Sequence, residues 1–575
     1  MLKTLGAQVK EFKKASIATP LFMILEVIME MIIPLMMASI IDDGVEKGDL
    51  HHIYVVGAFM VAAAAIGLFA GIMGGKYGAK ASAGFARNLR QAMFENIQEY
   101  SFSNIDKFST AGLVTHLQNA YQMILRMCMR APSSMIIAMI MSFYINARLA
   151  SVYLVAILIL GTCLFLIMRS AMKYFDQAFP KYDELNASVQ ENVSAIRVVK
   201  AYVREDHETS KFHKAAENIY KIFCKAEENL SFNAPLMQLT VYSCILLISW
   251  LGAKMIVGSS LTTGELMSLL TYCMNILMSL MMLSMVFVMI TMSLASARRI
   301  TEVLNEKSDL DNPENPDFDI PDGSITFDHV YFNYKKGAGE PVLSDINLSI
   351  KSGETIGIIG GTGSAKTSLV NLISRLYDVT EGSIKVGGKD VRSYDMETLR
   401  NEVAVVLQKN VLFSGTILDN LRWGDKNASE EECKRVCRLA CADEFIDRMP
   451  EGYNTYIEQG GSNVSGGQKQ RLCIARALLK KPKVLILDDS TSAVDTATDA
   501  KIRKAFLTEI PETTKLIIAQ RISSVQDADR IIVMENGKVN GFGSHEELLK
   551  TNEIYREVYE SQTGGGGDFD EKRGE

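Results

Sequence analysis

The chain has 575 residues, far more than one hydrophobic core usually serves, so at least two domains are expected. Its net charge is -7, and it has no arginine-rich arm or RNA-binding signature, which argues against nucleic acid as a partner. Apolar residues make up 48% of the chain, but they gather in long runs before about residue 296, and a mixed α/β pattern follows. The sequence therefore predicts a membrane domain followed by a domain outside the membrane.

Six stretches are long and apolar enough to cross a bilayer as helices, which takes roughly 20 residues each. The first is not a cleaved signal peptide, because it is too long, carries Glu26 and Glu30, and has no small-residue cleavage site. The six predicted spans lie near residues 15–41, 53–75, 131–146, 149–169, 234–258 and 265–293.

Lysine and arginine mark the cytoplasmic ends of membrane spans. Four lysines fall within the first 14 residues, and the long connections 76–130 and 170–232 are rich in both residue types. The connections at 42–52, 146–148 and 259–264 are short. This asymmetry predicts a multi-pass protein of the cytoplasmic membrane with both termini in the cytoplasm. The two long connections are expected to be helical extensions of the spans into the cytosol.

Changes in composition along the chain set the expected domain boundaries. Residues 1–304 form the predicted transmembrane domain with its cytosolic arms, and 305–324, where prolines stand among acidic and small polar residues, is a linker. Residues 325–563 alternate β-rich and helical runs, which is typical of an α/β domain. The last segment, 564–575, opens with four glycines and is expected to be disordered.

A glycine-rich loop directly follows the predicted strand Ile356–Ile359 and opens a helical pattern. Backbone N–H groups at a helix start suit a phosphate, while the loop's lysine adds positive charge and its threonine hydroxyl suits Mg²⁺. Ala365 replaces the glycine usual in such loops, and if that position needs a positive φ its Cβ costs on the order of 1 kcal/mol. A loop of this kind alone is also compatible with a structural turn. It consists of Gly360, Gly361, Thr362, Gly363, Ser364, Ala365, Lys366 and Thr367.

Two further motifs favour phosphate binding over a structural turn. Val484–Leu487 is an apolar strand followed by Asp488, a carboxylate placed to bind Mg²⁺ together with Thr367. Between the loop and this strand, small residues open another helical pattern and make a second phosphate cradle. This second cradle consists of Ser465, Gly466, Gly467 and Gln468.

The Ser-Gly-Gly-Gln motif between the two phosphate-binding motifs resembles the signature of ATP-binding-cassette (ABC) proteins, and the resemblance covers essentially the whole chain. It implies a multidomain fold, with the six-helix transmembrane domain of a type IV ABC exporter fused to a P-loop α/β nucleotide-binding domain, and ATP and Mg²⁺ as cofactors. It also implies that Tyr334 stacks on adenine, that Ser368 belongs to the nucleotide site, and that Asp495 lies in the D-loop. By the same resemblance, Gln408 is expected to be the residue that contacts Mg²⁺ and senses the membrane domain. For a tyrosine in a strand, plain packing is the alternative.

Two cytosolic segments resemble the coupling helices through which exporters of this family contact their nucleotide-binding domains. They are Ser103–Phe108 and Arg204–Phe212, and Glu191–Glu205 is similar to the family's intracellular arm. The alternative is a pair of solvated arms.

Two residues depart from the family pattern at catalytic positions. Asp489 stands where a catalytic glutamate is usual, and Gln520 stands where a switch histidine is expected. Both changes weaken hydrolysis, because a displacement of roughly 1 Å in a positioned group costs about a hundredfold in rate and glutamine cannot become cationic.

In this family two chains sandwich two nucleotides, each between the P-loop of one chain and the signature of the other. The resemblance therefore implies a heterodimer, in which this chain's own nucleotide site is degenerate, meaning that it lacks the usual catalytic residues. The signature Ser465–Gln468 then completes the hydrolytic site of a different half-transporter. The alternatives are a slow homodimer, or a regulatory subunit that binds ATP without hydrolysing it and gates its partner.

The sixth predicted span is rich in methionine, whose flexible, polarizable side chains favour export of varied small amphipathic or hydrophobic drugs. Helix packing or lipid contact is the structural alternative, and a lipid or peptide exporter is the functional one. Glu26 and Glu30 lie one helical turn apart and so share a face of the first span. One interpretation is that they attract cationic compounds; the alternatives are that they face a water-filled vestibule or pair with a basic group elsewhere in the chain. The substrate candidates are Met274, Met278, Met281 and Met285, and the same span holds Met267, Met282, Met289 and Met292.

Overall fold

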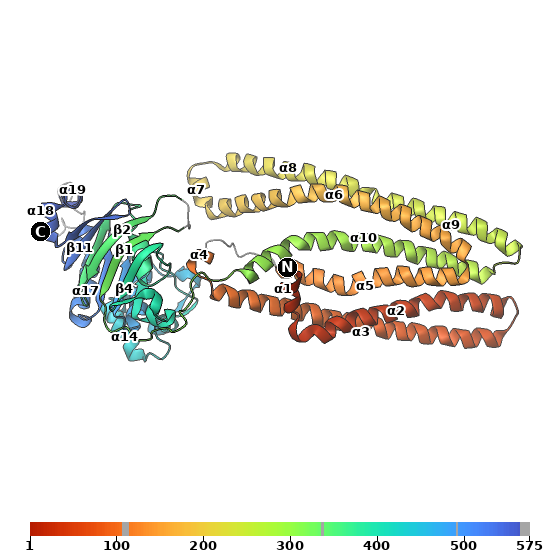
Figure 1. Ribbon diagram of the computed structural model, residues 1–575, viewed down its shortest axis with the longest axis horizontal. Coiled ribbons are helices and arrows are strands. Elements are labelled where there is room, and N and C mark those ends of the chain that lie inside the picture. The colour runs from red at the N-terminus through yellow and green to blue at the C-terminus, as the bar shows by residue number, and fades with distance from the viewer. Residues whose placement is uncertain (106–113, 335–338, 490–492, 564–575) are drawn as a thin grey trace. The chain divides into compact units, whose positions relative to one another are not determined.

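The computed structural model of the chain describes residues 1–105, 114–334, 339–489 and 493–563. The chain divides into two compact units (Figure 1). The first comprises Met1–Gln98 and Ser109–Glu306, and the second comprises Glu99–Phe108 and Lys307–Glu575. The tail 564–575 lies outside the described residues.

The first unit is built from helices. Among its described residues, six helical stretches are long and apolar enough to cross a membrane, and they confirm the six predicted spans: Lys10–Val45, Leu50–Gln98, Tyr121–Ile145, Ala147–Ser194, Glu205–Val257 and Thr263–Thr291. The helices are α1 (Leu2–Ala7), η1 (Lys10–Phe12), α2 (Lys13–Ser39), η2 (Ile40–Val45), α3 (Leu50–Gln98), α5 (Val114–Ile145), α6 (Ala147–Ser194), α7 (Ile196–Ala201), α8 (Glu205–Ser231), α9 (Asn233–Val257) and α10 (Thr263–Asn305).

The long helices exceed what a bilayer requires. Helix α3 has 49 residues and α6 has 48. At a rise of 1.5 Å per residue each is about 70 Å long, more than twice the roughly 30 Å of bilayer hydrocarbon. Each helix therefore continues well beyond the membrane, as expected from the lysine-rich connections.

Small residues and buried tyrosines hold these helices together. A Cβ on Gly74 of α3 would lie 2.4 Å from Cε of Met23 on α2, so the glycine lets the Met23 side chain pack directly on the α3 backbone. The buried hydroxyl of Tyr153 on α6 donates to the carbonyl of Leu269 on α10, at 2.7 Å. The Tyr153 hydroxyl thereby gives a backbone oxygen a hydrogen-bond donor in an otherwise apolar core.

The hairpin between α6 and α8 differs from the sequence-based expectation. A separate short helix, α7, lies between the two long ones at Ile196–Ala201. The predicted coupling segment, Arg204–Phe212, instead begins at the N-cap of α8 and continues through its first turns. The chain turns at Tyr202 and Val203, where Val203 has a left-handed backbone with φ 51°, and Arg204 follows with φ -111° and ψ 20°.

The second unit contains three β-sheets. The largest has the strand order β12-β11-β3-β10-β9-β6, a second has the order β2-β1-β4-β5, and β7 pairs with β8. The strands are β1 (Ile325–Phe332), β2 (Leu343–Ile350), β3 (Thr355–Gly360), β4 (Glu381–Val386), β5 (Lys389–Asp390), β6 (Val403–Val406), β7 (Gly415–Thr416), β8 (Tyr456–Ile457), β9 (Val484–Asp488), β10 (Thr514–Ile518), β11 (Arg530–Glu535) and β12 (Lys538–Gly543).

Helices cover both faces of the largest sheet. Helix α16 (Gly466–Leu479) contributes to the hydrophobic cluster on one face and α11 (Lys366–Ile373) to that on the other. The other long helices of this unit are α14 (Glu430–Leu439), α17 (Thr496–Glu509) and α19 (Glu553–Thr563), and the other short ones are α4 (Phe102–Ile105), α12 (Met396–Glu402), α13 (Ile417–Leu421), α15 (Asp443–Ile446) and α18 (His545–Thr551). Single turns of 3-10 helix are η3 (Val391–Ser393), η4 (Gly452–Asn454), η5 (Gln459–Gly461) and η6 (Ile522–Ser524).

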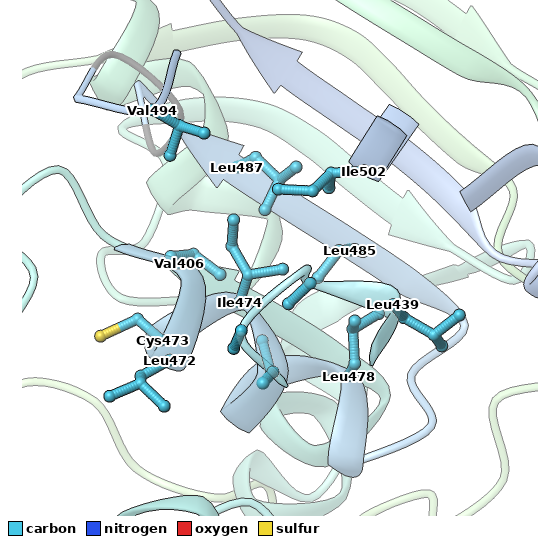
Figure 2. Packing of buried hydrophobic residues seen from close by; sticks show 14 of the residues in the cluster. Val406, Leu439, Leu472, Cys473, Ile474, Leu478, Leu485, Leu487, Val494 and Ile502 are labelled. Atoms are coloured by element: carbon cyan, nitrogen blue, oxygen red, sulfur yellow. The ribbon is translucent and has the colours of Figure 1, made fainter. Parts of the chain in front are cut away.

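Alternate residues of β9 belong to two different hydrophobic clusters. Leu485 and Leu487 pack beside Ile474 of α16 on one face, as Figure 2 shows. Ile486, between them in sequence, joins Leu369 of α11 in the cluster on the other face. Such two-sided burial is typical of a parallel sheet and explains why the strand reads as a continuous apolar run.

The segment expected to be a linker packs against the second unit. Leu310 and Ile320 are buried, and Asp317 forms an ion pair with Lys389. The first strand after this segment is β1, which starts at Ile325.

Candidate nucleotide-binding site

Four neighbouring parallel strands end at one edge of the largest sheet. Asp488 of β9 pairs with Ile518 of β10, which pairs in turn with Ile358 of β3, and β6 runs parallel to β9 on the other side. The glycine-rich loop follows β3, Asp489 follows β9, and Gln520 lies two residues after β10. The structure thus places the residues predicted from four separate motifs at the edge where ligands of open α/β sheets bind.

The glycine-rich loop has the backbone that makes Ala365 costly. Ala365 has φ 69° and ψ 25°, a left-handed conformation, immediately before the first residue of α11. The position therefore does need a positive φ, as the predicted cost of its Cβ required. Alanine in place of glycine raises the free energy of the folded loop by about 1 kcal/mol. Gly360 has a steric reason to be glycine, since its Cβ would lie 2.3 Å from the carbonyl oxygen of Met534.

The charged and hydroxyl side chains of the loop converge on the end of β9. Nζ of Lys366 donates to the carbonyl oxygens of Gly360 at 2.8 Å and Gly361 at 2.9 Å. The hydroxyl of Thr367 donates to Oδ1 of Asp488 at 3.2 Å. A hydroxyl and a carboxylate side by side form the oxygen donor set that a hard divalent cation prefers.

Burial shifts the acid–base properties of this pair of charged groups. It lowers the pKa of Lys366, although the nearby charges of Asp488 and Asp489 counteract part of that effect. Burial also raises the pKa of Asp488, whose side chain is nearly inaccessible, and the Thr367 hydrogen bond opposes that rise. Both groups therefore gain from a ligand that supplies the opposite charge.

Asp489 and Gln520 contact each other directly. Nε2 of Gln520 donates to Oδ2 of Asp489 at 2.8 Å, and Asp489 itself has a left-handed backbone with φ 50°. Gln562 of α19 secures the segment after β10, because its amide donates to the Gln520 carbonyl at 2.9 Å and accepts from the N–H of Ile522 at 2.8 Å. Sequence reasoning missed Gln562, which lies outside every motif.

The signature segment begins α16 with a complete set of cap hydrogen bonds. The N–H of Ser465 donates to Oε1 of Gln468 at 2.9 Å, while the N–H of Gln468 donates to the Ser465 hydroxyl at 3.3 Å. Gly467 packs closely, since its Cβ would lie 2.7 Å from the carbonyl oxygen of Ala493. Ser465 and Gly466 are exposed, so this helix N-terminus is rigid yet open to a ligand.

The segment predicted to be the D-loop is anchored to α16, the helix that follows the predicted signature. The N–H of Ala493 donates to Oε1 of Gln470 at 3.0 Å. Asp495 caps α17 by accepting from the N–H of Thr498 at 2.9 Å, and this bond lowers the pKa of the Asp495 carboxyl.

Tyr334 lies in an aromatic cluster beside the loop helix. Its hydroxyl hydrogen-bonds to Oγ of Ser368 at 2.9 Å, and its ring stands edge-on to the ring of Tyr377 at 5.1 Å. The side chain is 45% exposed, so part of the ring remains open to a ligand. The ring of Phe102, in α4, lies 6.1 Å from the ring of Tyr377.

Gln408 is exposed and lies two residues after β6. The apolar surface that follows it includes Phe413, stacked on Trp423 with ring centroids 4.0 Å apart. Both rings, with Lys409 and Arg476, line a groove of about 390 Å³. The motifs alone gave no sign of this groove.

In the first unit, Glu26 and Glu30 share one basic partner. Arg130 of α5 donates to Glu26 at 2.5 Å and to Glu30 at 2.9 Å. The structural-pair alternative is therefore realised, with a partner about a hundred residues away. The Oε2 atom of Glu26 is buried and has no hydrogen-bond partner within the described residues.

The methionines of α10 divide between two environments. Met267, Met274, Met278, Met281 and Met285 are exposed at a spacing of three, four or seven residues, which puts them on one face of the helix. Met282 and Met289 instead line a cavity of about 570 Å³ together with Arg126, Arg130 and Met23. The side chain of Met292 lies outside the described residues.

Comparisons with known proteins agree with the architecture. Residues 17–281 match the ABC transporter transmembrane region, and residues 343–492 match the ABC transporter family. The chain is 37% identical over 551 residues to an ABC transporter ATP-binding protein, YfiB, of Bacillus subtilis (strain 168), covering 95% of this chain and 96% of that protein.

Two further relatives are informative. An ATP-dependent lipid A-core flippase of Desulfotalea psychrophila is 35% identical over 488 residues, covering 83% of this chain and 84% of the flippase. A bacterial Atm1-family ABC exporter with ATP bound has the same fold, with a TM-score of 0.82 at 24% identity, covering 96% of this chain and 99% of that one. The chain therefore belongs to the ABC transporter family, as a multi-pass exporter half-transporter whose ATPase domain binds ATP and couples its hydrolysis to transport.

Proposed function

We propose that this chain exports small amphipathic or hydrophobic compounds across the cytoplasmic membrane as one half of a heterodimer. Its own ATP site is degenerate, and its signature completes the hydrolytic site of a different half-transporter. The single observation that carries this proposal is the hydrogen bond from Gln520 to Asp489, at the position where hydrolysis needs an unengaged base.

The geometry supports a slow own site. Asp489 is one methylene shorter than the glutamate usual at this position, and the Gln520 amide engages one of its carboxylate oxygens. A base must lie within hydrogen-bond reach of the water that it activates. A neutral amide also cannot supply the positive charge of a protonated histidine. Together with the strained Ala365, these changes affect only the P-loop side of the domain.

In this proposal, the signature Ser465–Gln468 still binds the ATP that the partner chain holds. Its exposed helix N-terminus presents backbone N–H groups and the positive end of the helix dipole, which suits the γ-phosphate of an ATP held by another chain. That chain would supply the P-loop glycine, the glutamate and the histidine missing here. In this chain's own site, Tyr334, the loop Gly360–Thr367 and Ser368 hold ATP, while Thr367, Gln408 and Asp488 hold Mg²⁺.

Contacts of α4 support its predicted role as a coupling segment. The hydroxyl of Ser103 donates to Asp309 at 2.8 Å, and the amide of Asn104 donates to the carbonyl of Lys307 at 3.1 Å. With Phe102 against Tyr377, these bonds join α4 to the unit that carries the ATP site. Residues 106–108 of this predicted segment lie outside the described residues. Coupling through α4 fits an arrangement in which both termini are cytoplasmic.

Purification of the chain alone and together with a co-expressed second exporter half tests the heterodimer. We expect the pair to hydrolyse ATP at least about tenfold faster than the chain alone, which corresponds to about 1.4 kcal/mol of transition-state stabilisation. Transport in liposomes should likewise require both chains. Equal ATPase activity of the chain alone would contradict the proposal and favour a homodimer.

The substrate proposal depends on the acidic pair in α2. Two carboxylates face one guanidinium, so the cluster keeps an excess negative charge, and the Glu30 side chain, 44% exposed, is accessible to a cation. The exposed face of Met274, Met278, Met281 and Met285 supplies apolar contact. Cationic amphipathic compounds combine these two features.

Charge changes at this cluster give a matched test. The change Arg130→Gln frees both carboxylates and should raise export of cationic dyes relative to neutral dyes by several-fold, or about 1 kcal/mol. The double change Glu26→Gln with Glu30→Gln should lower the same ratio. Equal effects on cationic and neutral dyes would leave the cluster with a structural role alone.

A lipid substrate is the second candidate. The cavity beside Arg130 also contains Arg126 and methionine side chains, a combination that suits an anionic headgroup with its acyl chains. The relative named as a lipid A-core flippase supports the same class. Stimulation of ATPase activity by anionic lipid, but not by cationic dyes, would favour this candidate.

A further inference from the structure

A separate cavity with both apolar and charged walls lies in the unit that contains the ATP site, at the opposite ends of two of the same strands. It has a volume of about 190 Å³, and its walls come from α17, from the starts of β3 and β10, and from the segment 524–528. Its polar wall residues are Thr355, Arg503, Lys504, Lys515, Ser524 and Asp527. None of these residues belongs to the ATP site.

Lys515 and Thr355 face this cavity together. They are direct partners in the parallel pairing of β10 with β3, and paired residues of neighbouring strands point to the same face of a sheet. Lys515 is 1% exposed and Thr355 is 8% exposed. A ligand can therefore reach these two side chains only if it is small enough to enter the cavity.

Both polar groups lack a partner. Oγ1 of Thr355 is buried without a hydrogen bond. Among the described residues, Lys515 has no side-chain hydrogen bond or ion pair, and the charge of Asp529 acts on it from beyond ion-pair distance. A buried unpaired charge is costly, and burial accordingly lowers the pKa of Lys515, opposed by the charge of Asp529. The side chains would gain from a ligand that accepts hydrogen bonds and carries negative charge.

The carboxylates around the cavity already have partners. Asp499 and Asp527 each lie 3.3 Å from the guanidinium of Arg503, and Asp499 also accepts from the Ser524 hydroxyl at 3.1 Å. Asp529 accepts from the N–H of Thr355 at 2.8 Å. Arg503 thus has two carboxylate partners, whereas Lys515 feels the charge of Asp529 without an ion pair to it among the described residues.

We propose that this cavity binds a small oxyanion of phosphate or sulfate size, held by the ammonium group of Lys515 and the hydroxyl of Thr355. Lysine and threonine together supply up to four donors, which matches the acceptor oxygens of such an ion. The volume equals about six waters of liquid density, enough for one oxyanion and a few waters. Because β3 leads into the P-loop and β10 leads to Gln520, bound anion stabilises the strands that support the ATP site.

A thermal-shift titration of the full-length chain tests this site, with sodium sulfate and sodium phosphate as separate probes. Sodium chloride at equal ionic strength controls for screening, and a saturable rise in melting temperature separates binding from the unsaturable effect of sulfate on proteins generally. All variants carry Lys366→Met, which removes anion binding at the P-loop.

Lys515→Met should weaken sulfate binding by more than about tenfold, as expected for loss of a charge-assisted hydrogen bond. It should also raise the melting temperature without sulfate, because an unpaired buried charge is removed. Thr355→Val should weaken binding by about threefold and provides the test if the first variant fails to fold. The control is Lys501→Met on α17, which removes a charge that pairs with Glu444 outside this cavity, and it should leave the affinity unchanged.

The response to the two probes identifies the occupant. Saturable binding of phosphate and sulfate with similar affinity supports a general oxyanion site, and a preference for phosphate supports a site for the product of ATP hydrolysis. Absence of saturation in the Lys366→Met chain, or the same affinity after Lys515→Met, overturns the proposal.

Discussion

The same domain contains two helix N-termini that suit a phosphate, and they differ in how they are built. Helix α11 begins after Ala365, which is left-handed and provides no side-chain cap, whereas α16 begins at Ser465 with both bonds of a capping box. The first lies beside Asp489 and Gln520, and the second has every residue of its motif. In the proposed degenerate site, ATP binding and ATP hydrolysis are separable, because Lys366, Thr367 and Asp488 are present while Asp489 and Gln520 stand at the catalytic positions.

The largest effect is expected at the signature. Gly466→Asp places a negative charge at the exposed start of α16, which in the proposed heterodimer faces the phosphate of the partner's ATP. Its Cβ would meet only the side chain of Ala493, at 3.6 Å, so the fold tolerates the change. The ATPase rate of the assembled pair should fall about a hundredfold, or about 2.7 kcal/mol.

Gly466→Ser is the matched control, because it adds a small neutral side chain at the same position. It should retain much more activity than Gly466→Asp in the same steady-state assay. Full activity of Gly466→Asp would show that this helix N-terminus faces no reacting phosphate.

A smaller effect is expected at the P-loop. Ala365→Gly removes a Cβ from the phosphate-binding loop, so the backbone can approach the phosphates more closely and ATP should bind this chain's own site up to about fivefold more tightly. Equilibrium titration of the isolated chain with a fluorescent ATP analogue measures the change.

Gly361→Ala provides the comparison at the P-loop, since a Cβ at that position meets nothing within 4 Å. It should have little effect on affinity. If Ala365→Gly also leaves the affinity unchanged, the alanine is not a cause of weak binding.

Restoring the catalytic residues should have a still smaller effect on the pair. The double change Asp489→Glu with Gln520→His adds a second competent site beside the partner's, so the total ATPase rate should at most about double. Each single change should do less, because one residue of the pair is still missing. A rate that stays at the parental value would show that other residues also limit this site.

The fold and the motif residues could be predicted because each depends on local pattern. The six spans follow from hydropathy, the β9 strand from a continuous apolar run, and the cost of Ala365 from backbone sterics at one position. These signals lie within a few residues of one another in the chain.

Contacts between distant residues could not be predicted in the same way. Arg130 reaches Glu26 and Glu30 across about a hundred residues, and only the packing of α5 against α2 brings them together. Tyr377 and Gln562 likewise contact site residues from segments without a motif. The position of the short helix α7 depended on where the α6–α8 hairpin turns, which helical periodicity does not specify.

The most direct test of the degenerate site compares Asp489→Asn with Gly466→Asp in the same assembled pair, by ATPase rate under saturating ATP. We predict that Asp489→Asn keeps the rate within about threefold of the parent, whereas Gly466→Asp loses about a hundredfold. Replacing the partner's expected catalytic glutamate should reproduce the loss seen with Gly466→Asp, because both changes act on one composite site. A loss from Asp489→Asn as large as that from Gly466→Asp would contradict the account and require both sites to hydrolyse ATP.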